Sequence, residues 1–396
     1  MRLLNKILIL FMVFALIGGL VNCGREETPE PAVVPEKAPP VPPPVITLGY
    51  VGHDHQIALY IAALEGERFK KDYGIYLKEI KSREIYELID GNNTLAQFQL
   101  IKVGGGSNTP AAMERGEIQI GLGGVAAFVD FVDKGNPLKI LCPLQTEGDL
   151  LVMKPDFPAD NWESFVDAVK NSAQPIKIGY KDPVAVAKLI FMRALKEVGI
   201  AYSMEANKEE KPPIELVNLQ GEKNMLPSLS SGAVDGFVMN QPAVSLAVHK
   251  KAGKVICDLS DLPPEGKWKN HPCCCVAATA DVIAKHKPAL KGLMKLIILS
   301  TEIITQDKKL AIKDTVSWTK VEEAVERDSI SSLVYLAMPN EGWKKGMVTW
   351  AEIMNEIGQF KKQLKDKDPM QVVRETCDFT IIEEAYKELK AKGLVK

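Results

Sequence analysis

From Val45 onward, short apolar runs alternate with longer segments in which apolar residues recur at helical spacing. A chain that alternates buried strands with amphipathic helices forms an α/β fold. The runs predict strands over 46–51, 75–80, 100–103, 118–122, 138–141, 150–153, 176–180, 214–219, 236–239, 255–258 and 274–278. The segments between them predict helices over 56–71, 110–115, 125–133, 162–170, 183–198, 224–231 and 242–250.

Beyond residue 280 the pattern becomes almost purely helical. One apolar stripe contains Leu290, Leu293, Met294, Ile297, Ile298 and Ile304, and a second contains Met347, Trp350, Met354, Ile357 and Phe360. Positions three and four apart share one face of a helix, so we interpret both stripes as core-facing surfaces rather than cofactor pockets.

The charges are close to balance, with 49 Lys and Arg against 51 Asp and Glu and a net charge of −2. Nucleic-acid binders and polybasic membrane proteins carry excess positive charge, so the composition argues against both classes. At 396 residues the chain is long enough for two domains. It contains no G-x-S-x-G, H-E-x-x-H or EF-hand motif. The hydrolases that such motifs identify are therefore excluded from the candidate functions.

The first 45 residues have the composition of a targeting segment and a linker. The apolar run 7–21 follows a short basic start and is shorter than the roughly 20 residues of a spanning helix, so 1–22 are predicted to be a signal peptide. The stretch L-V-N-C-G at 20–24 resembles the lipobox of bacterial lipoproteins, which implies acylation of Cys23. Eight prolines between 29 and 44 favour an extended tether over 23–45. We expect an extracytoplasmic protein anchored to the cell membrane by lipid; an ordinary signal peptide with a coincidental cysteine is the alternative.

Three stretches follow one another in a characteristic order: E-G-E-R-F-K-K-D-Y-G-I over 65–75, M-E-R-G-E-I-Q-I-G over 113–121, and S-G-A-V-D-G over 231–236 with Q-P at 241–242. Together they resemble the substrate-binding proteins of ABC importers for nitrate, sulfonates and taurine, a family with relatives tied to the pyrimidine moiety of thiamine. The resemblance covers roughly residues 46–360, with Gln119 and Gln241 in place of the family's usual Asp and Glu.

The resemblance implies a type II periplasmic-binding-protein fold, in which two α/β lobes joined by a hinge close on a ligand. Family topology places 46–148 plus 281–396 in one lobe and 149–280 in the other. It also implies a monomer that delivers a small solute to the permease and ATPase subunits of an importer.

A glycine-rich stretch at 104–110 is the first candidate for a ligand wall. In the expected fold, strand ends and helix N-termini line the cleft, where unpaired N–H groups favour an anion. Gly105 and Gly106 permit close backbone approach, and Ser107, Asn108 and Thr109 supply hydroxyl and amide groups. A plain turn before a capped helix is the alternative.

A second glycine-rich connection spans 121–126 and fits a G-x-G-x-x-A pattern. Such a pattern binds pyrophosphate in dinucleotide folds, but secretion disfavours a cytosolic nicotinamide cofactor. We therefore expect Gly123 and Gly124 to form a close backbone wall around the ligand, and we predict no cofactor.

His53, Asp54 and His55 directly follow the first predicted strand. Two imidazoles and a carboxylate suit a ligand contact through charge and hydrogen bonds, and they also suit a metal ion. Asp54 is in addition a candidate N-cap of the next helix. We expect ligand contact and predict no metal site.

In the second half of the chain, polar side chains again follow predicted strands. Tyr180 is a candidate to stack on a planar ligand and Lys181 to pair with an anion, although Asp182-Pro183 also suits a plain helix start. Asn240 and Gln241 follow a later strand and are candidate neutral contacts.

Cys273, Cys274 and Cys275 are adjacent and follow His271. Adjacent cysteines rarely bridge each other, because a disulfide needs a Cα separation of about 4.4–6.8 Å and a suitable torsion. The run resembles the longer cysteine-rich segment of the fungal pyrimidine synthase in the same superfamily, where iron is the associated metal. We interpret it here as a buried strand with thiols packed as small apolar side chains, and we place His271 at the cleft mouth.

The leading hypothesis is an extracytoplasmic lipoprotein that captures a small anionic or heterocyclic solute without turning it over. An enzyme of the pyrimidine-synthase kind is the first alternative, and a ligand-sensing receptor domain is the second.

Overall fold

The computed structural model describes residues 42–106, 108–204 and 212–396. The predicted signal peptide, Cys23, most of the tether and Ser107 lie outside the described residues. None of the helices within those ranges has the length and apolarity to cross a bilayer. Residues 43–396 form a single compact unit by their internal contacts.

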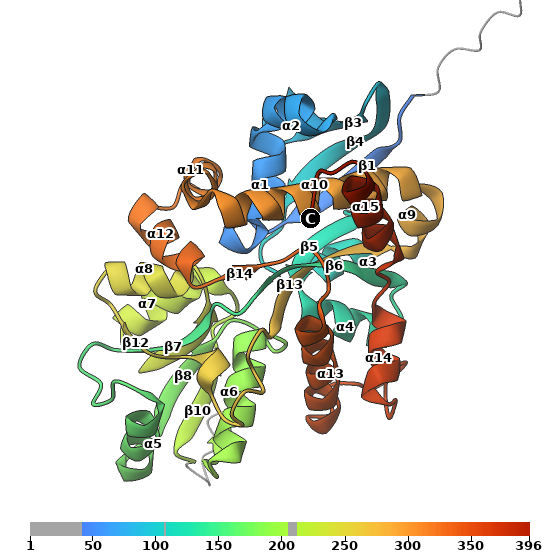
Figure 1. Cartoon of the computed structure of the whole chain (residues 1–396). Helices are drawn as coiled ribbons and strands as arrows, with labels where there is room; N and C mark the ends of the chain where they lie inside the picture. The colour runs from blue at the N-terminus through green and yellow to red at the C-terminus, as the bar shows by residue number, and fades with distance from the viewer. Residues whose placement is uncertain (1–41, 107, 205–211) are drawn as a thin grey trace, which may run out of the picture. The chain divides into compact units, whose positions relative to one another are not determined.

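The described residues build two sheets. The first has eight strands in the order β14-β6-β13-β5-β1-β4-β3-β2 (Figure 1). Its strands are β1 (Val45–Tyr50), β2 (Ile75–Lys81), β3 (Ile85–Asp90), β4 (Asn93–Lys102), β5 (Ile120–Gly124), β6 (Leu138–Thr146), β13 (Pro272–Thr279) and β14 (Val334–Tyr335). β1 runs parallel to both β4 and β5, whereas β13 is antiparallel to β5 and β6.

The second sheet has six strands in the order β12-β7-β11-β8-β10-β9. They are β7 (Asp149–Met153), β8 (Ile176–Tyr180), β9 (Tyr202–Ser203), β10 (Ile214–Asn218), β11 (Gly236–Asn240) and β12 (Lys254–Asp258). β8 is parallel to β10 and β11, and β7 is antiparallel to β11 and β12.

The longest helices of the described residues, α10 and α13, follow residue 280. The helices are α1 (Ile57–Leu64), α2 (Gly66–Tyr73), α3 (Asn108–Glu114), α4 (Val125–Asp133), α5 (Trp162–Asn171), α6 (Val186–Glu197), α7 (Met225–Ser230), α8 (Ala243–His249), α9 (Ala280–Lys285), α10 (Lys287–Gln306), α11 (Lys308–Thr319), α12 (Glu323–Ser331), α13 (Glu341–Glu356), α14 (Pro369–Thr376) and α15 (Thr380–Ala391). Single 3-10 turns η1 (Asp54–Gln56), η2 (Glu222–Asn224) and η3 (Leu259–Asp261) complete the set.

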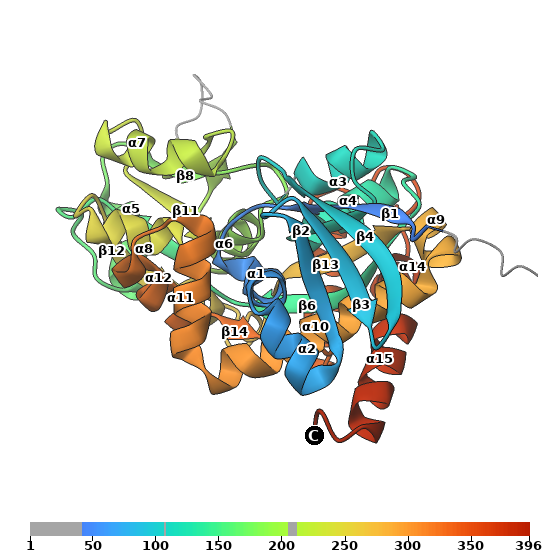
Figure 2. The ribbon, with the colours of Figure 1, turned by 90° about the horizontal axis from the view of Figure 1, so that it is seen from above.

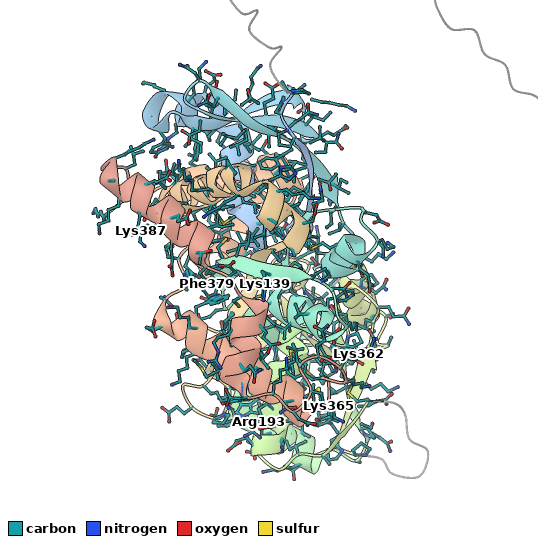
Figure 3. The ribbon with its side chains drawn as sticks, turned by 90° about the vertical axis from the view of Figure 1, so that its right-hand side faces the viewer. Lys139, Arg193, Lys362, Lys365, Phe379 and Lys387 are labelled. Carbon is teal, nitrogen blue, oxygen red and sulfur yellow. The ribbon has the colours of Figure 1, made fainter. Side chains whose placement is uncertain are left out.

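Both predicted helical stripes lie in the core. α10 buries its whole stripe against α1 and α15 over the eight-stranded sheet. The stripe of α13 is buried except for Ile357, which is 39% exposed because the helix ends at Glu356. The last two helices return to the first sheet: Asp378 N–H donates to the Ile140 carbonyl of β6 at 2.9 Å, and Phe379 follows in the connection to α15, near Lys139 of β6 (Figure 3). Phe379 also packs edge-on against Trp343 of α13, with ring centroids 5.6 Å apart.

Three local predictions differ from the structure. The helix predicted over 56–71 is broken at Glu65, where Gly66 brings the chain close to β2; a Cβ on Gly66 would lie 2.4 Å from the Leu77 carbonyl oxygen. The hairpin β3–β4 has no counterpart among the predicted strands except the end of β4, although Asp90-Gly91 is a strong turn signal. β13, which the predicted boundaries place in the second lobe, pairs with β5 and β6 of the first sheet.

Candidate functional site

Two adjoining cavities lie between the sheets. The inner one, of about 30 Å³, is lined on the first-sheet side by His53, His55, Gly106, Gly124, Ala127, Cys273 and Cys274, and on the second-sheet side by Asp149, Lys181, Asp182, Val184, Ala185, Val186 and Asn240. The outer one, of about 290 Å³, is lined by Gly104, Gly105, Gly106, Asn108, Lys181, Asp182, Pro183, Asn218, Gln220, Gly221 and Glu222. Since a water needs roughly 10–15 Å³, the inner cavity suits a water or an ion, and the outer one suits a small organic molecule.

The loop after β1 directs two imidazoles into the inner cavity. His53 has an extended backbone and its Nδ1 accepts the His55 N–H at 3.2 Å, so His53 caps the 3-10 turn. The His53 carbonyl accepts the Tyr60 hydroxyl at 2.7 Å, which ties the loop to α1. The cap considered for Asp54 is therefore made by His53 instead.

Asp54 lies behind the site and does not line either cavity. Its side chain is fully buried and accepts the Ser329 hydroxyl through Oδ2. Its Oδ1 lies 3.9 Å from His55 Nε2; both atoms are buried, and neither has a hydrogen-bond partner among the described residues. Burial and the nearby Glu326 carboxyl raise the pKa of Asp54 well above its usual range.

The thiols of β13 face the same imidazole. Sγ of Cys273 and Sγ of Cys274 each lie 3.5 Å from His55 Nδ1. Neighbouring residues of a regular strand point to opposite faces, but the pairing with β6 shifts register on both sides of Cys274 and brings the two thiols together. Cys275 points the other way, into the opposite core cluster. The predicted packing of thiols as apolar side chains therefore describes Cys275, whereas Cys273 and Cys274 line the cavity.

Electrostatics keep the two imidazoles uncharged at neutral pH. Burial, together with the charge of Lys181, lowers the pKa of His53 to about 3. Burial also lowers the pKa of His55 well below its usual value, with His53 and Lys181 adding to the effect. A neutral imidazole offers a lone pair to a ligand or a cation.

Lys181 brings a positive charge to both cavities from the end of β8. Its ammonium donates to Asn240 Oδ1, and the Asn240 amide donates to the Gln241 carbonyl at 2.7 Å. Burial is the largest single effect and opposes the charged form, but nearby acidic groups, with Asp182 and Glu222 foremost, together outweigh it and raise the pKa of Lys181. The side chain is therefore a charged, oriented donor.

His271 and Asp149 form a buried pair that links the segment before β13 of the first sheet to the start of β7 of the second sheet. His271 precedes β13 and Asp149 begins β7; their Nε2 and Oδ2 lie 3.0 Å apart, and both side chains are buried. His271 Nδ1 is 2.8 Å from the Trp268 carbonyl. Burial is the largest single effect and lowers the pKa of His271, but the hydrogen bond and charge of Asp149, together with the Trp268 carbonyl and Asp258, outweigh it and raise the pKa. His271 thus lies beneath the cavity and positions Asp149, which lines it.

Several predicted contacts lie away from the cavities. Thr109 is buried and donates to the Leu122 carbonyl at 3.3 Å. Gly123 is packed beneath Gly106. Tyr180 is buried beside the Lys188 ammonium, 5.0 Å from its ring centroid. Gln241 caps α8 through the Ser245 N–H at 3.0 Å.

His53, His55, Gly105, Gly106, Asn108, Gly124, Lys181 and Asn240 do line the cavities. Ligand contact at these positions stays a prediction. Sequence reasoning missed Asp149, Asp182 and the turn Gln220–Glu222 as lining residues. The turn follows β10. Because the ends of strands line the cleft in this fold, its position after a predicted strand could have indicated it as a lining segment.

α12 links the second sheet to the wall of the site. It packs against α8 (Figure 2). His249 Nε2 lies 2.7 Å from Asp328 Oδ2, and the Gln241 amide donates to Ser332 Oγ at 3.1 Å. Because Ser329 of the same helix holds Asp54, α12 connects both sides of the cavity.

Comparisons with known proteins agree on the fold. The model of the NMT1-like family matches residues 39–319. An uncharacterized protein of Methanocaldococcus jannaschii is 33% identical over 143 residues, which is 35% of this chain and 90% of that protein.

Among solved structures, the zinc-bound ligand-binding component of an ABC-type import system from Staphylococcus aureus has a TM-score of 0.66 at 14% identity, covering 86% of this chain and 99% of that one. The nitrate-binding protein NrtA from Synechocystis PCC 6803 has a TM-score of 0.65 at 15% identity, covering 89% and 91%. The sulphonate-binding protein SsuA from Escherichia coli has a TM-score of 0.60 at 13% identity, covering 85% and 92%. The predicted α/β periplasmic-binding-protein fold is confirmed.

Proposed function

The chain belongs to the NMT1-like family, and on that premise we propose that it captures a small solute between two lobes and passes it to the permease and ATPase of an ABC importer. The solved structures of similar fold include binding proteins for nitrate and sulphonate, which supports this role. We keep the predicted two-lobe arrangement, 46–148 plus 281–396 and 149–280, as part of the proposal, with the exception that β13 of the second range pairs with the first sheet.

The observation that carries the proposal is the lining of the cavities. In the outer cavity, glycine backbone and the Asn108 amide come from the first-sheet side, and Lys181, Asp182 and Glu222 come from the second. A ligand held by both sides favours the state in which they are close together, and a permease can recognise that state. The outer cavity, with the Lys181 ammonium and the Asn108 amide in its wall, suits a small anionic or heterocyclic solute.

The N-terminal features complete the proposal. A lipid on Cys23 and a proline-rich tether would hold the binding unit outside the cytoplasmic membrane. The expected cellular form is a monomer that docks on its permease. Metabolic labelling with a fatty acid tests the anchor, because a Cys23→Ala variant should lose both the label and the membrane fraction.

Thermal unfolding with a panel of nitrate, sulfonates, taurine, aromatic acids and thiamine pyrimidines tests the solute role. We expect at least one class to raise the midpoint without being consumed. A Lys181→Ala variant should lose that shift, whereas Lys223→Ala, an exposed lysine next to the outer cavity, should keep it. A flat response to the whole panel would refute this solute class, and chemical conversion of a panel member would favour the enzyme alternative.

A further inference from the structure

The inner cavity carries a donor set that the solute role does not use. We propose that His53, His55, Cys273 and Cys274 form a binding site for one thiophilic transition-metal ion, with Zn²⁺ as the best chemical match. The imidazoles follow β1 and the thiols lie on β13, so all four side chains belong to the first sheet. The four donors are therefore in place whether or not the two lobes close on a solute. The metal-site proposal does not depend on the solute role proposed above.

The distances between donor atoms fit a tetrahedral ion. With Zn–N of about 2.0–2.1 Å and Zn–S of about 2.3 Å, tetrahedral angles separate a nitrogen and a sulfur ligand by about 3.5 Å. His55 Nδ1 lies 3.5 Å from the sulfur of Cys273 and 3.5 Å from that of Cys274. One donor atom from each of His53, His55 and Cys274 lie within 4.8 Å of one another. Cys273 is outside this group of three and is assigned to the site by its distance to His55.

A second, independent observation lies behind His55. A metal-bound histidine usually donates its other ring N–H to a carboxylate or carbonyl, which orients the ring. Coordination through Nδ1 leaves the proton of His55 on Nε2, which faces Asp54 Oδ1 at 3.9 Å. Both atoms are buried and have no hydrogen-bond partner within the part of the chain that the structure describes. A small rotation of the ring toward Asp54 satisfies both atoms at once, while Ser329 already holds the other oxygen of Asp54.

The size of the inner cavity and the charge of the donor set are compatible with one bound metal ion. The inner cavity of about 30 Å³ is too small for an organic solute. On coordination each thiol releases its proton to solvent, so Zn²⁺ and two thiolates form a neutral set. Lys181 lines the same cavity from the second sheet, so the thiolates would lie near a positive charge.

Titration of the purified, reduced and metal-stripped protein with Zn²⁺, and with Co²⁺ as a spectroscopic probe, tests the proposal. We expect one ion per chain, visible d–d bands of tetrahedral Co²⁺ and a near-ultraviolet thiolate-to-cobalt band. Cys274→Ser and His55→Ala should each weaken binding on the order of 100-fold or more, and Asp54→Asn by about 10–100-fold. Cys257→Ser, which changes a half-buried cysteine outside the cavities, is the matched control and should bind as the parent does.

Circular dichroism and thermal unfolding without metal first establish that each variant is folded. A variant that fails to fold is replaced by its partner, Cys273→Ser for Cys274 and His53→Ala for His55. The absence of the thiolate band, or equal affinity in the Cys274→Ser and Cys257→Ser proteins, would overturn the proposal. If the metal site is refuted but a solute still raises the thermal-unfolding midpoint, the proposed transport role is retained. If zinc binds but no solute raises the midpoint, the metal site is retained and the transport role is refuted.

Discussion

Replacement of Gly123 by alanine should destabilise the wall of the site. Gly123 lies in β5, and a Cβ there would lie 2.7 Å from the Gly106 carbonyl oxygen, 3.1 Å from Thr109 Oγ1 and 3.2 Å from Thr109 Cβ. The closest of these contacts is to backbone, which cannot rotate away, so the loop carrying Gly106 must move. Overpacking of this kind costs about 1–3 kcal/mol of unfolding free energy. Because Gly106 lines both cavities, solute affinity should fall as well.

Urea unfolding followed by tryptophan fluorescence measures this effect. Gly124→Ala is the matched control, since among the described residues its Cβ would meet only the Cys273 carbonyl oxygen, at 3.9 Å, an ordinary contact. We expect a lower midpoint for Gly123→Ala with an unchanged slope, and little change for the control. Equal unfolding free energies for the two variants would show that β5 and the glycine loop are not packed as described.

Three further predictions follow from the charged groups. Lys181→Met should weaken binding of an anionic solute about 10–100-fold, because a hydrogen bond to a charged group contributes about 1.5–3 kcal/mol; calorimetry showing unchanged affinity would contradict this. Asp149→Ala should lower the unfolding free energy by about 3–5 kcal/mol, since it leaves His271 buried without its partner; a chemical-denaturation loss below about 1 kcal/mol would argue against a buried pair. Burial raises the pKa of Asp314 from 3.8 to about 6, so the folded state binds this proton more tightly than the unfolded chain, and stability should fall as pH rises from about 4 to about 6. Asp314→Asn should remove that part of the pH dependence, and an identical pH profile in the two proteins would refute the assignment.

Local patterns predicted much of the secondary structure. The helix over 125–133 and the strand over 176–180 were predicted with the bounds of α4 and β8. One error was local: β3 has the sequence I-Y-E-L-I-D and was not predicted as a strand, although it pairs with β2 and β4, its neighbours along the chain. The break after Glu65 depends on β2, which lies against Gly66.

The sequence by itself determined the α/β alternation, the family and the strand ends that carry His53, His55, Lys181 and Asn240, because periodicity and turn chemistry are local. Only the tertiary structure decided that Cys273 and Cys274 meet His55, since more than 200 residues separate them and the register shifts of β13 arise from its pairing with β6. A strand's neighbours and the direction of a bulged side chain are set by pairing across the sheet, which no short stretch of sequence encodes.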